Sequence, residues 1–194
     1  MSPEVVVLYE DQRRGRDFWL HELLLQMVAD TNGAELWTLN PRCLGVPLKG
    51  VSKLLESVRE ASKIARAGRL MVLVDRDQLR QALYETGRGE PKLPPDVDDL
   101  TLTEAVRRRA DIPETVQVFL SYPNMEGLIR AIQGCDPSLL PEEVRRALQK
   151  ELASRELVLA EVKKARNRDL RDCVRRHQPG VHGLALAVAQ ALTS

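Results

Sequence analysis

The segment Leu70-Met71-Val72-Leu73-Val74-Asp75-Arg76-Asp77 decides the fold class of this chain of 194 residues. Its first five residues form an uninterrupted apolar run, which is typical of a strand buried on both faces of a parallel sheet. The run ends abruptly in two carboxylates that are separated by one arginine. Because ligands of open parallel sheets bind at the carboxyl ends of the strands, this segment predicts a central strand and, directly after it, a site.

The rest of the chain alternates between strand and helix patterns. Strands are expected at three further places, namely Val5 to Tyr9, Ala34 to Leu39 and Thr115 to Leu120. Apolar residues at helical spacing predict helices between them, at about 18–29, 51–67, 78–84 and 125–133. This alternation predicts an α/β fold with a mostly parallel, Rossmann-like sheet of about four strands and helices on both faces. Residues 1–135 are expected to form this core, and residues 136–194 a C-terminal helical extension packed on it, either as a subdomain or as outer-layer helices.

The composition is that of a soluble globular protein, with 43% hydrophobic and 29% charged residues. Aromatic residues make up 4%, which argues against an aromatic platform for stacked bases. No apolar stretch approaches the roughly 20 residues that cross a bilayer, and the first residues lack the pattern of a signal peptide. We therefore expect a cytoplasmic protein with no membrane partner.

The three cysteines, Cys43, Cys135 and Cys173, lie far apart and include no C-x-x-C pair. An odd number of cysteines at this spacing suits neither a disulfide framework nor a zinc site. Neither feature is expected from the sequence.

Positive charge gathers in residues 161–176, which hold seven Lys or Arg and three acids. Four of these cations recur at spacings of three or four residues and would form a basic stripe on a helix: Lys164, Arg168, Arg171 and Arg175. Such a stripe could contact the phosphates of DNA or RNA. The alternatives are an ordinary solvated face and a surface that docks an acidic partner subunit.

Carboxylates follow three of the four expected strands. Glu10 follows the first strand, Asp75 and Asp77 follow the third, and Glu126 comes a few residues after the fourth. The i, i+2 spacing of Asp75 and Asp77 lets both side chains point the same way while the chain is extended. Mg²⁺ prefers oxygen ligands, commonly one or two carboxylates with waters and substrate phosphates. We therefore expect Glu10, Asp75 and Asp77 to bind Mg²⁺ or Mn²⁺, the alternative being that each acid is a helix cap or a loop residue.

Three motifs resemble the TOPRIM fold of topoisomerases, primases and OLD-type nucleases. They are VVVLYE at 5–10, LVDRD at 73–77 and PNMEGL at 123–128, and the resemblance covers roughly residues 4–135. The motifs look most like those of small stand-alone TOPRIM-like proteins from bacterial phage-defence loci. The resemblance implies that Glu10 is a general acid/base or metal ligand, that Asp75 and Asp77 are the Mg²⁺-binding pair, and that Glu126 is the late acid of the stand-alone group.

Two features depart from the family pattern. TOPRIM glutamates are often followed by glycine, whereas Asp11 follows here, and no lysine lies close after the late acid. A lysine partner would have to come from Lys163 or Lys164.

The expected activity is that of a Mg²⁺-dependent nuclease, or a nuclease subunit, acting on phosphodiester bonds of nucleic acid. The resemblance suggests antiviral defence together with a separate ATPase, since the chain has no G-x-x-x-x-G-K-[ST] motif of its own. The alternatives are a non-catalytic TOPRIM-like interaction or regulatory module and a metal-dependent phosphatase or other phosphotransfer enzyme.

Overall fold

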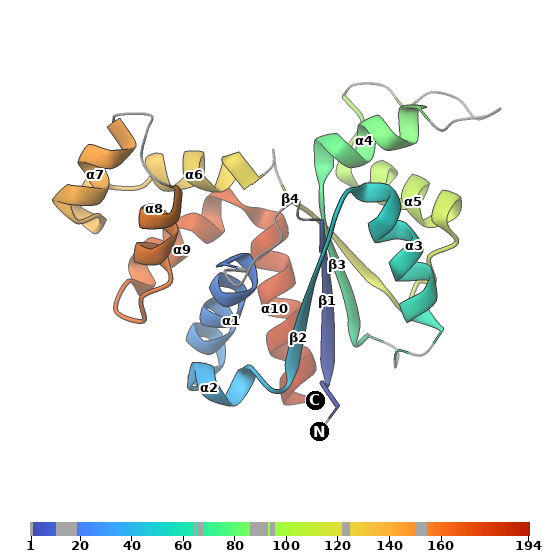
Figure 1. The fold of residues 1–194 in the computed structure, drawn as a ribbon, viewed down its shortest axis with the longest axis horizontal. Helices are drawn as coiled ribbons and strands as arrows, with labels where there is room; N and C mark the ends of the chain where they lie inside the picture. Colours follow the sequence, from blue (N-terminus) through green and yellow to red (C-terminus); the bar gives the residue numbers. More distant parts are fainter. Residues whose placement is uncertain are drawn as a thin grey trace.

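The structure, a computed structural model, describes residues 2–10, 19–63, 65, 68–85, 93, 96–121, 125–149 and 155–194. A four-stranded sheet lies at its centre, with helices on both faces (Figure 1). The expected α/β class with extra C-terminal helices is confirmed. No helix in the described part of the chain combines the length and the apolar character needed to span a bilayer.

All four strands are parallel and lie in the order β2-β1-β3-β4. Their bounds are Val5–Glu10 for β1, Cys43–Leu48 for β2, Leu70–Asp75 for β3 and Gln117–Ser121 for β4. The first five residues of β3 are buried and β1 is nearly so, because both strands are central and have helices on each face. The uninterrupted apolar runs of the sequence therefore mark the centre of the sheet.

Helices cover the two faces of the sheet unequally (Figure 1). One face packs against α3 (Val51–Ser62), α4 (Arg76–Glu85) and α5 (Asp99–Ala110). The other packs against α1 (Trp19–Asn32) and the last helix, α10 (Pro179–Thr193). Gly180 lets the start of α10 approach the sheet, because a Cβ there would lie 1.6 Å from the carbonyl oxygen of Leu120. Part of the C-terminal extension thus packs directly on the strands.

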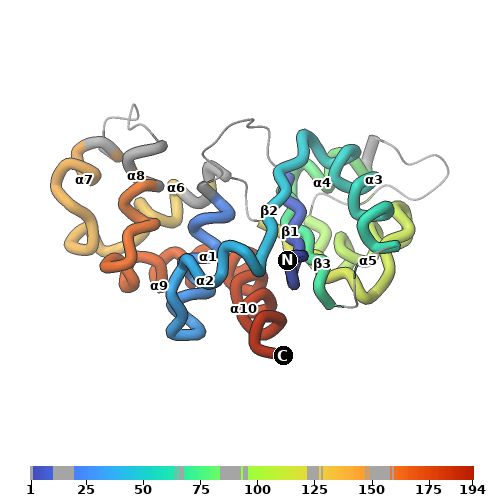
Figure 2. The backbone as a smooth tube through the Cα atoms, turned by 60° about the horizontal axis from the view of Figure 1, so that its bottom comes forward, coloured from blue at the N-terminus to red at the C-terminus, as the bar shows by residue number. Residues whose placement is uncertain are grey.

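The remaining helices of the extension lie on the side of the molecule away from α3, α4 and α5 (Figure 2). They are the 3-10 turn η1 (Pro137–Leu139), α7 (Glu142–Gln149), α8 (Arg155–Val162) and α9 (Arg168–His177). Helix α6 (Met125–Gln133), which belongs to the predicted core, lies on the same side (Figure 2). Cys135, just after α6, forms a disulfide with Cys173 of α9. The expectation that the cysteines form no disulfide is therefore wrong. Its physical reason is that 38 residues separate the two cysteines, and only the packing of α6 on α9 brings them together.

The expectation for the second strand is wrong. Residues 36–39 form the short helix α2 (Leu36–Leu39), and β2 begins only at Cys43. This strand contains Gly45 and Pro47, two residues that weaken an internal strand but are tolerated in β2 because it lies at an edge of the sheet. Gly45 is also needed for packing, since a Cβ at this position would lie 2.4 Å from the ring of His21.

Candidate active site

The carboxyl ends of the four strands meet at one edge of the sheet, at the top of Figure 1. Glu10 is the last residue of β1, and Asp75 is the last residue of its neighbour β3. Helix α4 begins directly after Asp75 with no loop between them. The parallel topology therefore brings these two acids to the same place, as the sequence predicted.

A hydrogen bond connects the two acids. The backbone N–H of Asp75 donates to Oε2 of Glu10 at 3.1 Å, across 65 residues of sequence. Asp75 in turn caps α4, because its Oδ1 accepts from the backbone N–H groups of Asp77 at 2.9 Å and Gln78 at 3.1 Å. Its Oδ2 accepts no hydrogen bond from any described residue and is available as a ligand atom.

Partial burial dominates the electrostatics of Asp75. It raises the pKa of this carboxyl above its ordinary value, and the nearby charge of Asp77 acts in the same direction. The two capping N–H groups lower the pKa and offset only part of the increase. The ionised carboxylate is therefore poorly compensated in the metal-free chain, and a cation beside it would be favoured.

The arrangement of the D-x-D segment differs from that of an extended chain. Asp77 already lies in the first turn of α4 and is exposed, so the same-face reasoning for i, i+2 residues in a strand does not apply. Arg76, between the two acids, turns away and pairs with Asp99 at the start of α5, with 2.7 Å between Nε and Oδ1.

The three acids do not form one tight cluster. Among the described side chains, the group of three ligand residues whose atoms all lie within 4.8 Å of one another is Cys135, Cys173 and His177, not Glu10, Asp75 and Asp77. Mg²⁺ needs only one or two protein carboxylates, with water and substrate oxygens completing its octahedron. The donor set fits such an ion when Asp75 Oδ2 is combined with a carboxylate oxygen of either Glu10 or Asp77.

Glu126 is the second residue of α6, the helix that follows β4 at this edge. Its side chain lies outside the described part of the structure, as do residues 11–18 and 122–124, which follow β1 and β4 in the sequence. Its proposed catalytic role stays a prediction.

The four residues of the predicted basic stripe do not share one exposed face, since Lys164 and Arg168 are exposed and Arg171 is buried. Arg171 is completely buried and forms a two-pronged ion pair with Asp30 of α1, at 2.6 and 2.9 Å. It also donates to the carbonyl oxygens of Val162 and Ala165. This residue is therefore structural, and its assignment to nucleic-acid contact is wrong.

The other three members of the stripe differ from one another. Arg175 is mostly buried and bonds to Asp172 and to the carbonyl oxygen of Met27. Lys164 pairs with Glu161, whereas Arg168 is exposed and forms no ion pair with another described side chain. Lys164 lies in the turn between α8 and α9, so the four cations do not share one helix. Arg171 and Arg175 of α9 face α1 rather than solvent.

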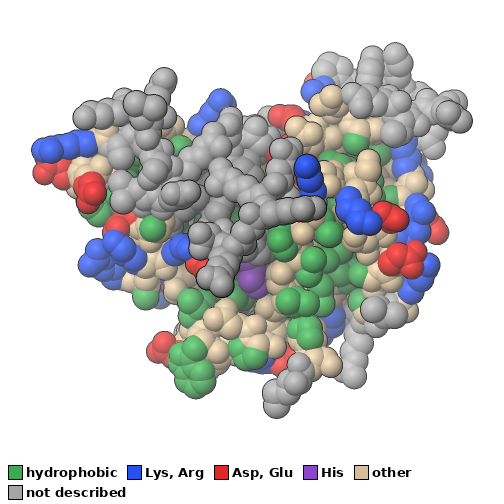
Figure 3. All heavy atoms as spheres, in the orientation of Figure 1, with side chains coloured by type: hydrophobic (Ala, Val, Ile, Leu, Met, Phe, Trp, Pro, Cys, Tyr) green, Lys and Arg blue, Asp and Glu red, His purple; other side chains and the backbone are tan. Residues whose placement is uncertain are grey.

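Two other cations line a cavity near the acidic edge. The cavity, of about 230 Å³, opens between the starts of α3 and α4, and it is lined by Lys49, Lys53 and Gln78 among others. The backbone N–H of Gln78 donates a hydrogen bond to Asp75, so the cavity adjoins the acidic edge. Lys53 pairs with Glu56, while Lys49 is exposed and forms no ion pair with a described side chain. Figure 3 shows Lys and Arg side chains exposed over this part of the molecule.

Sequence reasoning did not select these lysines. Lys49 stands alone between a strand and a helix, with no charge pattern around it to distinguish it from any loop lysine. Only the pairing of β2 with β1 brings it to the edge where Glu10 ends its strand.

Comparison with protein-family models, with curated proteins and with solved structures finds no match to this chain. The resemblance to TOPRIM proteins therefore rests on the three sequence motifs.

Proposed function

We propose that this protein is a metal-dependent enzyme that cleaves phosphodiester bonds of nucleic acid at the edge formed by Glu10 and Asp75. The observation that carries the proposal is the hydrogen bond between these acids, which joins the ends of two adjacent parallel strands at 3.1 Å. The exposed carboxylate of Asp77 follows within the next two residues. Carboxylates gathered at this edge are the ligands that phosphoryl-transfer enzymes use for Mg²⁺.

Each acid has a distinct part in the proposed chemistry. Asp75 is held by its cap, which aims one oxygen at α4 and leaves Oδ2 as a ligand atom. Glu10 positions the start of α4 through Asp75 and serves either as a second ligand or as the group that accepts a proton from the attacking water. Bound Mg²⁺ would supply Lewis-acid polarisation of the phosphoryl oxygen and lower the pKa of its water.

Substrate binding requires positive charge at the same edge, because clustered acids repel a polyanion. Lys49 meets this requirement, with Lys53 beside it in the same cavity. We assign phosphate contact to these lysines rather than to Arg171 and Arg175, whose side chains are buried or nearly so. The motifs also support a separately encoded ATPase partner in phage defence, and copurification of such a subunit would test that part of the proposal.

The test is cleavage of plasmid DNA, single-stranded DNA and RNA by the purified chain, with Mg²⁺ or Mn²⁺ and with a chelator. We expect metal-dependent cleavage of at least one substrate by the wild type and its loss in Asp75→Asn. Asp169→Asn, which removes an exposed acid on α9, is the matched control and should leave cleavage unchanged.

Two alternative outcomes identify the other candidate functions. Hydrolysis of small phosphate monoesters without cleavage of nucleic acid would assign the site to a phosphatase. Binding of Mn²⁺ without turnover of any substrate would assign the protein to the non-catalytic interaction modules. Either outcome would overturn the nuclease proposal.

A further inference from the structure

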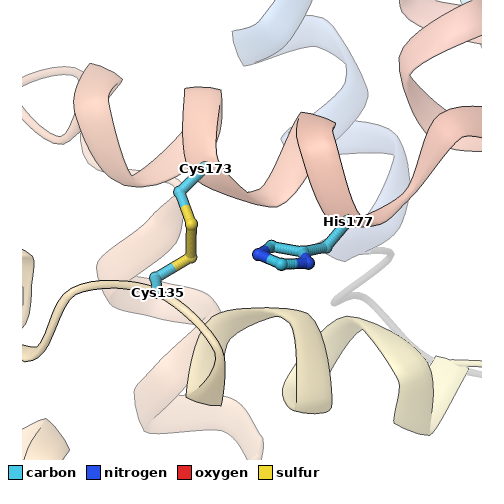
Figure 4. A group of neighbouring side chains, drawn as sticks. All are labelled: Cys135, Cys173 and His177. Carbon is cyan, nitrogen blue, oxygen red and sulfur yellow. A yellow bond between two sulfur atoms is a disulfide. The ribbon is translucent and has the colours of Figure 1, made fainter.

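A second group of chemically reactive side chains lies on the helical side of the molecule. Cys135 follows α6, and Cys173 and His177 belong to α9 (Figure 4). The two cysteines are buried and disulfide-bonded, with their Cα atoms 6.0 Å apart. None of the acids of the candidate active site belongs to this group.

The disulfide involves only the two cysteines, and His177 is the third residue of the group. It follows Cys173 by four residues, so both side chains project from the same face of α9. The imidazole ring points toward the two sulfurs (Figure 4), and a ligand atom of each residue lies within 4.8 Å of the other two. The ring forms no hydrogen bond or ion pair with any described residue.

The ring of His177 lies close to Gly134 at the end of α6. A Cβ at Gly134 would lie 3.7 Å from Cε1 of His177, which is ordinary contact distance, so the ring rests over the end of α6. The site also lies at the carboxyl end of α9, where the helix dipole favours a cation. Both features suit a metal ion held between the two helices.

The donor set selects the metal. Reduction of the disulfide by a thiol reductant such as glutathione consumes two electrons and two protons and yields two thiols. Two thiolates and one imidazole are the donors that Zn²⁺ prefers, whereas Mg²⁺ and Ca²⁺ prefer oxygen. In a tetrahedral zinc site the two sulfurs would be about 3.8 Å apart and each would be about 3.6 Å from the nitrogen. Rotation about the Cα–Cβ bonds of the cysteines can open the sulfurs to that distance.

We propose that, once the disulfide is reduced, Cys135, Cys173 and His177 bind one Zn²⁺ ion, with water in the fourth position. The two thiols release their protons to solvent as they bind, and the complex of Zn²⁺ with two thiolates and neutral histidine carries no net charge. A neutral complex suits the buried position of the sulfurs. The disulfide and the zinc ion are then alternative cross-links between α6 and α9, used under oxidising and reducing conditions respectively.

The experiment uses the full chain, reduced with a phosphine and freed of metal, with Co²⁺ as the spectroscopic probe. We expect one equivalent of Co²⁺ to produce a thiolate-to-cobalt charge-transfer band and the visible bands of a tetrahedral ion. Zn²⁺ should abolish both by displacement. The oxidised chain should give neither signal.

Variants assign the ligands. Cys173→Ser should remove the charge-transfer band, and His177→Ala should weaken Zn²⁺ binding by more than about tenfold in competition with a chromogenic chelator. Cys43→Ser is the matched control and should bind as the wild type does. Burial raises the pKa of Cys43 to about 12, so this thiol is a poor ligand.

Three results would overturn the proposal: no tetrahedral cobalt spectrum in the reduced wild type, equal binding by the oxidised chain, or Zn²⁺ affinity that His177→Ala leaves unchanged. Circular dichroism checks that each variant is folded. If Cys173→Ser does not fold, the comparison of oxidised and reduced wild type decides the question without any substitution.

Discussion

Asp75 has two roles in the structure that a pair of substitutions can separate. Its Oδ1 caps α4, and its charge is poorly compensated because burial raises its pKa. Asp75→Asn removes the charge and keeps an oxygen that can accept from the capping N–H groups, since Asn is as good an N-cap as Asp. Asp75→Ala removes both the charge and the cap.

The expected magnitudes follow from this difference. Loss of the cap should make Asp75→Ala less stable than Asp75→Asn by about 1 kcal/mol. For a chain of this size, that difference lowers the melting temperature by roughly 2–4 °C. Without metal, Asp75→Asn should be as stable as the wild type or more stable at neutral pH. Both variants should lose metal-dependent cleavage.

The pH dependence gives an independent check of the charge effect. Because the folded-state pKa of Asp75 is raised above its unfolded value, the folded chain holds this proton more tightly. Its contribution favours folding at low pH and is lost as pH rises from the unfolded pKa through the folded one. Relative to the wild type, Asp75→Asn should therefore gain stability as pH rises through this range.

The assay is thermal unfolding followed by circular dichroism in the presence of a chelator, across pH, together with cleavage of DNA and RNA. Asp98, which caps α5 by accepting from the N–H of Thr101 at 2.9 Å, provides the matched control. That hydrogen bond lowers the pKa of Asp98, so Asp98→Asn should lose stability at neutral pH where Asp75→Asn does not. The reasoning is refuted if Asp75→Asn is as destabilised as Asp75→Ala, because the charge would then be a structural partner. It also fails if Asp75→Asn cleaves at the wild-type rate.

Three further predictions concern the surrounding structure. Lys49→Ala should weaken nucleic-acid binding and reduce the slope of log affinity against log salt by about 0.7–0.9, as measured by fluorescence anisotropy at several salt concentrations. An unchanged slope would show that Lys49 does not contact the nucleic acid. Arg171→Ala should destabilise the chain by about 3–5 kcal/mol in denaturant unfolding, because the buried Asp30 then keeps only its longer contact with Arg175, at 3.6 Å. The exposed Arg168→Ala should change stability by less than about 0.5 kcal/mol, and equal stabilities of the two variants would contradict the buried ion pair. The disulfide closes a loop of 38 residues, so its reduction should lower the free energy of unfolding by up to about 4 kcal/mol in the absence of zinc. An unchanged free energy of unfolding would show that Cys135 and Cys173 are not bonded in solution.

The centre of the fold could be predicted from the sequence because burial on both faces leaves a simple pattern. Val5–Tyr9 and Leu70–Val74 are apolar throughout, and each is a central strand. The edge strand β2 has no such constraint, since Gly45 and Pro47 can occupy it and make it resemble a loop. Its position was therefore missed.

The candidate site was predictable in part for the same reason. Strand ends can be located from apolar runs, and parallel topology then brings Glu10 and Asp75 together. The partners of Arg171 and Cys135 could not be predicted, because Asp30 and Cys173 reach them only through helix packing across long stretches of sequence. The spacing of cations along one segment of the sequence gives no information about ion pairs with a residue of another helix.

A crystal structure of the chain grown with Mn²⁺ tests the central claim most directly. The account predicts an anomalous peak at the carboxyl edge of the sheet, about 2.1 Å from Asp75 Oδ2 and from a carboxylate oxygen of Glu10 or Asp77. The same peak should be absent from crystals of Asp75→Asn. If wild-type crystals grown at the Mn²⁺ concentrations used in the cleavage assay show no Mn²⁺ at this edge, these acids do not form a metal-dependent active site.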